Sequence, residues 1–404
     1  MVAIIKRYIY GGITWFIQLL FKTCFLHEEP ANTEMSNILV IRLDEIGDVV
    51  LMSPFLRELR RNYPKATITL IVKTETYNLV ELCPYVNKVL TFPKQKGKWR
   101  FFKIIFETFR FTCYNLRKTF FDLAIVPRWD ADEGYGAGWI ALFSGAARRI
   151  GYSEHVYKKK EILDYCFNRF YTEVIDRREF KHEVERNLDV LRYLSCHIET
   201  ADLEVWTDLN DKEYAVQWFN ACLPDRKKKI VIALFLSAGS KLKEWSVSNF
   251  ATVLKNLSQK YPLHVVMLGD RANTEQYGEC FLQEFGADAV SNLIGKTSLR
   301  ETIEILKGCD LYFGGDTGPM HLAAACNIDG VVLFFLPKGI YKTIDGISPP
   351  ERFGPWNSKL LVLQPAEPEG DESEWDFERS MPSISLDAVQ TSLEEICECK
   401  LKGC

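Results

Sequence analysis

The segment Gly314–Ala325, with the sequence GGDTGPMHLAAA, carries the clearest chemical signal in this chain of 404 residues. A strand-like run from Leu311 ends in it, and a helix of small residues follows. Backbone N–H groups at the start of such a helix, together with the helix dipole, favour an anion such as a phosphate. Pro319 suits the first helical turn, where its missing N–H costs nothing. A tight turn capped by Asp316 or Thr317 would use the same residues, but the glycines on both sides of Asp316 favour a ligand site.

A second candidate lies in Ile38–Pro54, with the sequence ILVIRLDEIGDVVLMSP. It predicts a buried strand, a short loop with Asp44, Glu45 and Asp48, and then a helix. The dinucleotide fingerprint G-x-G-x-x-G is absent, which weakens a dehydrogenase interpretation. Asp48 is either a helix cap or a general base, and this stretch alone favours the cap.

A third candidate is Leu236–Trp245, with the sequence LSAGSKLKEW, where another strand-like run enters a loop. Lys241 and Lys243 would supply charge for a diphosphate there, although surface lysines are usually only solvated. The D-x-D pair Asp130 and Asp132 is a common chance match, and the six histidines include no pair at metal-ligand spacing. The sequence therefore predicts no metal site and no cofactor.

The composition excludes several classes of protein. Fifty basic and 54 acidic residues give a net charge of −4, which offers no dominant basic field for nucleic acid. Hydrophobic residues make up 47% of the chain, enough for a large globular core. Nine of the twelve cysteines are scattered singly, and only Cys397, Cys399 and Cys404 cluster. Scattered thiols indicate reduced core residues and a cytoplasmic protein.

Apolar strand-like runs alternate with helical patterns from Asn37 onward, which predicts parallel sheets covered on both faces. The expected fold class is therefore α/β, with two doubly wound domains whose ligands bind beyond the carboxyl ends of the strands. The predicted strands are Ile38–Leu43, Thr67–Val72, Val89–Phe92, Asp122–Val126, Lys229–Leu236, Leu263–Leu268, Leu311–Gly314 and Val331–Leu336. The predicted divisions are an N-terminal helix and linker over 1–35, domains over 36–205 and 206–383, with an acidic loop at 365–383, and a C-terminal helix and tail over 384–404.

The N-terminal residues 3–23 form a helical pattern that combines a Trp/Phe/Leu face with a basic stripe. The uncharged run Tyr8–Phe21 is too short to span a bilayer. Two interpretations remain equally open, a helix lying in a membrane interface and a helix packed on the protein's own core. The first would place the protein on the inner face of the inner membrane as a peripheral protein.

The motifs together resemble glycosyltransferase family 9, the ADP-heptose:lipopolysaccharide heptosyltransferases and their relatives. The resemblance covers roughly Ser36 to Ile396 and leaves out residues 1–35 and the acidic loop. It is carried by IRLDEIGDVVLMSP, Lys243-Glu244-Trp245 and GGDTGPMHLAAA, with support from Arg149-Ile150-Gly151-Tyr152, His182–Leu194 and Pro350–Pro355.

The resemblance implies a GT-B fold, two Rossmann-like domains that face across a cleft, and inversion without a metal. It assigns Asp48 as the general base, whereas the local sequence alone favours a helix cap. It places Lys243 on the donor phosphates, Thr317 and Gly318 at the same diphosphate, and Asp316 on the hydroxyls of the transferred sugar.

The resemblance also implies which residues bind the donor ribose and the acceptor, and which reaction the protein catalyses. Asp270 or Glu275 would bind the donor ribose, and Arg42, Arg128 and Arg149 would meet an anionic acceptor such as a Kdo-type sugar. The expected activity is transfer of a heptose or related sugar from a nucleotide diphosphate sugar, with ADP-heptose favoured, to a lipopolysaccharide core or other cell-surface glycan. The alternatives are a non-catalytic homologue that binds a sugar nucleotide and a GT-B-like nucleotide-sugar epimerase.

Overall fold

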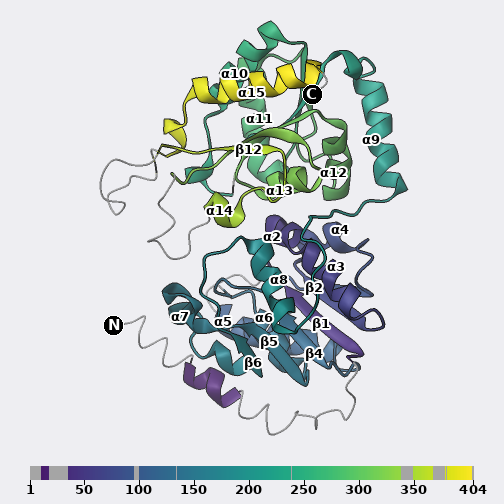
Figure 1. Ribbon diagram of the computed structural model, residues 1–404, viewed down its shortest axis with the longest axis vertical. Helices are drawn as coiled ribbons and strands as arrows, with labels where there is room; N and C mark the ends of the chain where they lie inside the picture. Colours follow the sequence, from purple (N-terminus) through teal and green to yellow (C-terminus); the bar gives the residue numbers. More distant parts are fainter. Residues whose placement is uncertain are drawn as a thin grey trace. The chain divides into compact units, whose positions relative to one another are not determined.

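The computed structural model describes residues 11–17, 35–94, 100–132, 134–237, 239–337, 349–366, 378 and 380–402. The chain divides into two compact units, Met1–Ala201 and Asp202–Cys404. Each unit is built on one six-stranded sheet flanked by helices (Figure 1).

The sheet of the first unit is parallel throughout, with the strand order β3-β2-β1-β4-β5-β6. Its strands are β1 (Asn37–Arg42), β2 (Thr67–Val72), β3 (Lys88–Thr91), β4 (Leu123–Val126), β5 (Arg148–Tyr152) and β6 (Glu173–Ile175). Central β1 is apolar from Ile38 to Ile41 and fully buried there, as expected for a strand covered on both faces. Since the strands are parallel, the residues that follow them gather at one edge of the sheet.

The helices of the first unit fill the connections between these strands. They are α2 (Ile46–Leu51), α3 (Ser53–Asn62), α4 (Tyr77–Val80), α5 (Arg100–Asn115), α6 (Ala137–Phe143), α7 (Lys158–Leu163) and α8 (Glu183–Tyr193). Helix α6 packs on the face of the sheet that carries Leu39 and Ile41 of β1 and Ala124 of β4. Helix α8 packs against α2 and α3, so it brings its buried polar residues close to the end of β1.

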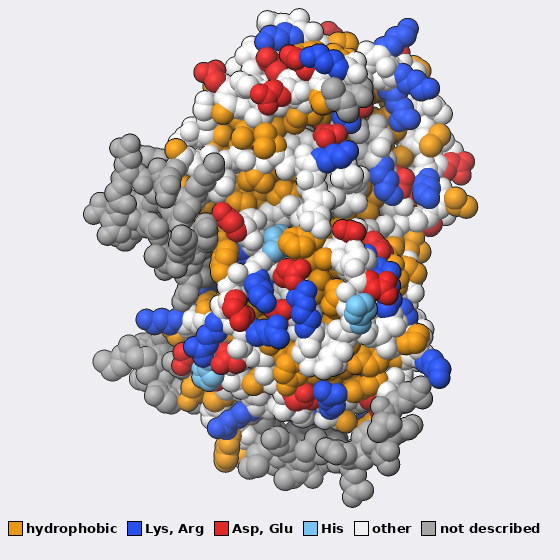
Figure 2. All heavy atoms as spheres, viewed as in Figure 1, with side chains coloured by type: hydrophobic (Ala, Val, Ile, Leu, Met, Phe, Trp, Pro, Cys, Tyr) orange, Lys and Arg blue, Asp and Glu red, His pale blue; other side chains and the backbone are white. Residues whose placement is uncertain are grey.

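Charged side chains of both signs are interspersed over α8 (Figure 2). Asp189 is buried beneath them and contacts Lys181 at 2.7 Å, Arg192 at 2.8 Å and Arg177 at 2.9 Å. Three cations around one buried carboxylate lower the pKa of Asp189 even though burial itself raises it. These ion pairs tie α8 to the chain that precedes it.

The second unit repeats the plan with the strand order β12-β11-β10-β7-β8-β9, again parallel throughout. Its strands are β7 (Ile230–Phe235), β8 (Leu263–Met267), β9 (Val290–Asn292), β10 (Leu311–Gly315), β11 (Asp329–Leu333) and β12 (Leu360–Leu363). Its helices are α9 (Leu209–Cys222), α10 (Val247–Lys260), α11 (Arg271–Phe285), α12 (Leu299–Gly308), α13 (Gly318–Ala325), α14 (Pro350–Phe353) and α15 (Leu386–Lys402). The two doubly wound α/β domains expected from the sequence are confirmed.

Helix α15 belongs to the core of the second unit. It packs against α10 and β11, and Val389, Leu393 and Cys397 are fully buried in the main apolar cluster of this unit. Cys397 is therefore a core residue, while Cys399 on the same helix is exposed and Cys404 lies outside the described residues.

The structure describes the N-terminal helix over residues 11–17 only, and the rest of the predicted helix lies outside the described residues. Gly11 and Thr14 are buried, and Ile17 packs with Ile104 of α5 and Phe170. Trp15 and Phe16 are 48% and 56% exposed. The described part therefore packs on the protein with one face and exposes two aromatic rings on the other. Within the described residues no helix is long and apolar enough to cross a membrane.

Candidate active site

The carboxyl edge of the first sheet is organised around Arg42, the last residue of β1, which is only 1% exposed. Its Nη1 donates to the carbonyl of Pro127 at 2.9 Å and to Oδ1 of Asn187 at 3.0 Å. Its Nε lies 2.7 Å from Oδ2 of Asp44, which is equally buried. Its Nη2 reaches Oδ1 of Asp48 at 3.3 Å. A buried guanidinium with this many partners has a fixed position, so it also fixes the carboxylates around it.

Asp48 occupies the third position of α2. Its Oδ2 accepts from the N–H of Glu45, the residue that caps this helix, at 3.3 Å, and the Glu45 side chain bonds back to the N–H of Asp48. Burial raises the pKa of Asp48 to about 6, because the opposing attraction of Arg42 is offset by the negative charges of Glu183 and Asp130. About 23% of its side chain stays exposed. Asp48 is therefore both a helix-capping residue and a carboxylate poised to accept a proton near neutral pH.

A second polar group at this edge was not predicted from the sequence. Lys73, the residue after β2, is buried and pairs with Oε2 of Glu45 at 2.6 Å. The hydroxyl of Tyr135 donates to Oε1 of Glu45 at 3.1 Å and accepts from Nζ of Lys94 at 3.0 Å. The charges of Lys73, Lys94 and Arg128 lie within 5.4 Å of the Tyr135 ring centre. The position of Lys73 at a strand end, like that of Arg42, is the signal that would have found it.

The three predicted acceptor arginines do not lie together. Arg128, which follows β4, pairs with the Asp44 carboxylate beside Arg42. Arg149 is instead the second residue of β5, toward the opposite end of the strand, and only 2% exposed. Its Nη1 and Nε donate to the carbonyls of Ala146 at 2.6 Å and Phe170 at 2.8 Å. Arg149 therefore lies apart from Arg42 and Arg128, because its guanidinium joins two backbone segments inside the unit.

Asp132 of the D-x-D pair has a structural role in the first unit. Asp132 accepts from the N–H groups of Gly136 at 2.8 Å and Ala137 at 3.1 Å, where it caps the start of α6. Its own N–H donates to Asp164 at 2.9 Å. Among the described residues no group of three or more His, Cys, Asp or Glu side chains is arranged to hold a metal ion.

In the second unit, Lys243 and Asp316 come together from separate strands. Lys243 ends a short 3₁₀ helix, Lys241–Lys243, after β7, and Asp316 follows β10. The Nζ of Lys243 lies 2.5 Å from Oδ2 of Asp316, whose side chain is 7% exposed. Burial raises the pKa of Asp316, and Lys243 opposes that shift. The pair puts one cation and one carboxylate at the carboxyl edge of the second sheet.

Helix α13 begins directly beside this pair. Thr317 stands at the N-cap position without a side-chain hydrogen bond to the helix, Gly318 is the first residue of α13, and Pro319 follows in the first turn. Gly314 is favoured by packing, since a Cβ there would lie 3.0 Å from the carbonyl oxygen of Phe235, whereas a Cβ on Gly315 would lie 3.5 Å from the carbonyl oxygen of Lys243, an ordinary contact. The amino end of α13 thus directs its backbone N–H groups toward the edge that holds Lys243.

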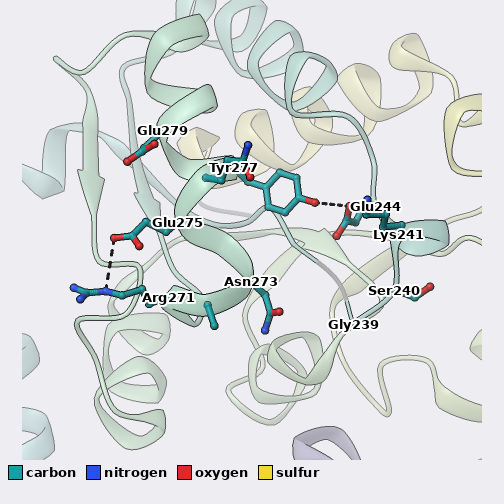
Figure 3. Close-up of a pocket in the computed structure, with 11 residues that line it drawn as sticks. Gly239, Ser240, Lys241, Glu244, Arg271, Asn273, Glu275, Tyr277 and Glu279 are labelled. Atoms are coloured by element: carbon teal, nitrogen blue, oxygen red, sulfur yellow. Dashed lines mark hydrogen bonds and ion pairs between the residues drawn. The ribbon is translucent and has the colours of Figure 1, made fainter.

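A cavity of about 620 Å³ opens on the same unit, between the loop after β7 and helix α11 (Figure 3). Glu275 lies on α11 at this cavity, 3.7 Å from Arg271, and Tyr277 donates its hydroxyl proton to Oε2 of Glu244 at 2.8 Å. Asp270 is not among the lining residues, and its carboxylate caps α11 by accepting from the N–H of Asn273 at 2.9 Å. Glu275 is therefore the better of the two candidate ribose ligands.

Two doubly wound α/β domains, with polar groups gathered at the carboxyl edges of their sheets, are the architecture of GT-B glycosyltransferases. The family model described as glycosyltransferase family 9 (heptosyltransferase) matches residues 114–374. The chain belongs to this family, and it is a glycosyltransferase.

Individual relatives agree with this assignment. Lipopolysaccharide heptosyltransferase 2 of Escherichia coli is 25% identical over 338 residues, which cover 81% of this chain and 87% of that protein. A family 9 glycosyltransferase structure from Veillonella parvula matches with a TM-score of 0.72 at 19% identity, covering 90% and 98% of the two chains. The structure of E. coli ADP-heptose LPS heptosyltransferase II matches with a TM-score of 0.64 at 20% identity, covering 89% and 98%.

Proposed function

We propose that this enzyme transfers a heptose from ADP-heptose to an anionic glycan of the lipopolysaccharide core, with inversion and without a metal ion. The family supports the donor and the acceptor class, as do two similar E. coli proteins, lipopolysaccharide heptosyltransferase 2 and ADP-heptose LPS heptosyltransferase II. The observation that carries the mechanism is the Asp48 carboxylate, fixed by Arg42 and with a pKa raised to about 6.

Asp48 acts as the general base in this proposal. An acceptor hydroxyl gives its proton to a carboxylate oxygen of Asp48 while the hydroxyl oxygen bonds to the anomeric carbon of the donor sugar. The bond from that carbon to the diphosphate oxygen breaks in the same step, and its electron pair leaves with ADP. Attack on the face opposite the leaving group inverts the anomeric centre.

The second unit stabilises the departing diphosphate. Lys243 supplies a positive charge, and the N–H of Gly318 at the amino end of α13 supplies a hydrogen-bond donor with the helix dipole behind it. Asp316 exchanges its ion pair with Lys243 for the hydroxyls of the transferred sugar. Glu275, at the cavity beside α11, accepts hydrogen bonds from the ribose hydroxyls.

The acceptor meets the cations at the carboxyl edge of the first sheet. Arg42 is too buried to bind it and instead positions Asp48. Arg128, Lys73 and Lys94 surround the ring of Tyr135 and offer cations to an acidic sugar, which would share them with Asp44 and Glu45. The acceptor is lipid-linked in this proposal, so the enzyme works at the cytoplasmic surface of the inner membrane.

The test is release of ADP from ADP-heptose in the presence of a lipid-linked Kdo-type acceptor. Asp48→Asn should lower kcat by at least about 100-fold while leaving ADP-heptose affinity nearly unchanged. Asp176→Asn is the matched control, because Asp176 is half-exposed and pairs with Arg178. Turnover of Asp48→Asn at the rate of the control would refute the assignment.

The same assay separates the alternatives. An epimerase would convert ADP-heptose to another sugar nucleotide without acceptor, which NMR of the mixture detects. A non-catalytic homologue would bind ADP-heptose in calorimetry but release no ADP with any acceptor. A strict requirement for an added divalent cation would contradict the proposed mechanism.

A further inference from the structure

Helix α5 exposes a row of phenylalanines. Phe102, Phe106 and Phe109 are 45%, 62% and 41% exposed, while Ile104 and Thr108 on the opposite side of the helix are buried. The spacing of four and then three residues puts the three rings on one helical face. We call these three residues the aromatic stripe. Single exposed apolar residues are ordinary, but a continuous row on one face marks an interaction surface.

The N-terminal helix packs on an apolar cluster that α5 also contacts. The ring of Phe109 lies 5.4 Å from that of Phe143, and Phe143 belongs to the apolar cluster against which Ile105 of α5 and Ile17 both pack. Ile17 of the N-terminal helix and Ile105 of α5 therefore contact one shared apolar cluster. The N-terminal helix exposes Trp15 and Phe16, by 48% and 56%, in the same unit as the aromatic stripe.

The surface beside the aromatic stripe is basic. Residues 100–118 contain five Lys and Arg and one acidic residue, a net charge of +4 in a chain whose total is −4. The acidic residue, Glu107, is neutralised by Arg110, with Nη2 and Oε2 2.5 Å apart. Exposed Lys103 and Arg110 lie on the solvent side of α5 next to the phenylalanines, and exposed Arg117 follows the helix.

We propose that the aromatic stripe, together with Trp15 and Phe16, binds the surface of a bilayer that contains anionic lipid. Aromatic rings enter the region between headgroups and acyl chains, and the adjacent Lys and Arg side chains contact the lipid phosphates. Exposed aromatic rings beside basic side chains favour a membrane as the partner over a second copy of this chain. A symmetric dimer through this surface would place two segments of the same positive charge against each other, which is unfavourable.

The inference rests on the proposed function in one respect: an enzyme with a lipid-linked acceptor must reach a membrane surface. Binding to vesicles that contain neither acceptor nor donor tests the surface alone. A failure of the proposed activity therefore leaves this result unchanged, and a failure to bind lipid leaves the transfer assay on a detergent-solubilised acceptor unchanged.

The experiment is co-sedimentation of the full chain with vesicles of phosphatidylcholine, with and without phosphatidylglycerol. The wild type should bind the mixed vesicles at least tenfold more tightly than the neutral ones, and added salt should reduce the binding. Phe102→Ser/Phe106→Ser should lower binding at least tenfold. Leu209→Ser/Val216→Ser on α9 is the matched control, because these residues of the second unit are 79% and 56% exposed, and it should bind as the wild type does.

A second variant distinguishes a loss of lipid binding from a folding defect of the double-Phe variant. Lys103→Glu/Arg117→Glu keeps the phenylalanines and should abolish the preference for phosphatidylglycerol. The proposal is overturned if the double-Phe variant binds as the wild type does, or if binding ignores anionic lipid. It is also overturned if sedimentation velocity shows that the wild type is a dimer and that Phe102→Ser/Phe106→Ser is a monomer whose vesicle binding is unchanged.

Discussion

The Arg42 guanidinium is shared between two carboxylates, with Nη2 at 3.3 Å from Asp48 and at 3.4 Å from Glu183. It also pairs with Asp44, which Arg128 contacts as well, so the charge of Arg42 is divided among three neighbouring carboxylates. Asp48 consequently receives less stabilisation of its ionised form than a carboxylate with an arginine of its own would. Burial raises the pKa of Asp48 to about 6, and this arrangement explains why the neighbouring arginine does not reverse that shift.

The first prediction concerns pH. The base form of Asp48 is the ionised one, so kcat/KM should rise with pH through about 6 and fall about tenfold per unit below it. Glu183→Gln removes a negative charge that raises the pKa of Asp48, so the acid limb should move to lower pH. Glu185→Gln, which affects the exposed pair with Arg192, should leave the limb in place. An acid limb that stays fixed or moves upward in Glu183→Gln would contradict the proposed coupling.

The second prediction concerns the leaving group. Lys243→Met removes the cation proposed to stabilise the departing diphosphate, so kcat for ADP release should fall about 100-fold or more. Lys241→Met is the matched control, since Lys241 lies on the same short 3₁₀ helix and does not contact Asp316 in any hydrogen bond that the structure describes. The two variants should therefore differ by at least about tenfold in kcat. Equal effects would mean that only the general charge of this segment matters.

The third prediction separates Glu275 from Asp270. Glu275→Ala should raise the donor KM about tenfold, because it removes a charged hydrogen-bond acceptor from the cavity, while the melting temperature stays unchanged. Asp270→Ala removes the cap of α11, so it should lower the free energy of unfolding by about 1 kcal/mol. Steady-state kinetics and thermal unfolding of both variants measure the difference. The reverse pattern, with Asp270 controlling the donor KM, would exchange the two roles.

The fold followed from the sequence wherever a strand was long and apolar. The eight predicted strands are all present, with ends within three residues of the prediction. Four strands were missed: β6 and β9 because three residues are too few to form a pattern, β5 because it begins with two arginines, and the apolar but four-residue β12. Parallel pairing with the neighbouring β4 stabilises β5 in spite of those residues.

The site was predictable only in part, because some of its contacts join residues that are far apart in the sequence. Strand-end motifs located Asp48, Lys243 and Asp316 because each is close in sequence to a turn that a ligand can approach. Glu183 reaches Arg42 across 141 residues of chain, and no local pattern indicates a contact at that separation. Arg149 shows the converse, since two adjacent arginines look like surface charge while the fold buries one of them.

The fourth prediction concerns the acceptor edge. The Tyr135 hydroxyl accepts from Lys94 and donates to Glu45, which in turn holds Lys73, so one phenol oxygen links two of the cations proposed to bind the acceptor. Tyr135→Phe keeps the ring and its cation contacts but breaks both hydrogen bonds. It also removes one of the interactions that lower the pKa of Glu45.

With Lys73 and Lys94 less well positioned, the acceptor KM should rise about tenfold, equivalent to about 1.4 kcal/mol, while the donor KM stays unchanged. Tyr63→Phe is the control, because its hydroxyl contacts Cys196 elsewhere in the same unit. Steady-state kinetics with each substrate varied in turn measures the effect. A rise in the donor KM, or a neutral acceptor that loses as much affinity as an acidic one, would show that this cluster does not read the charge of the acceptor.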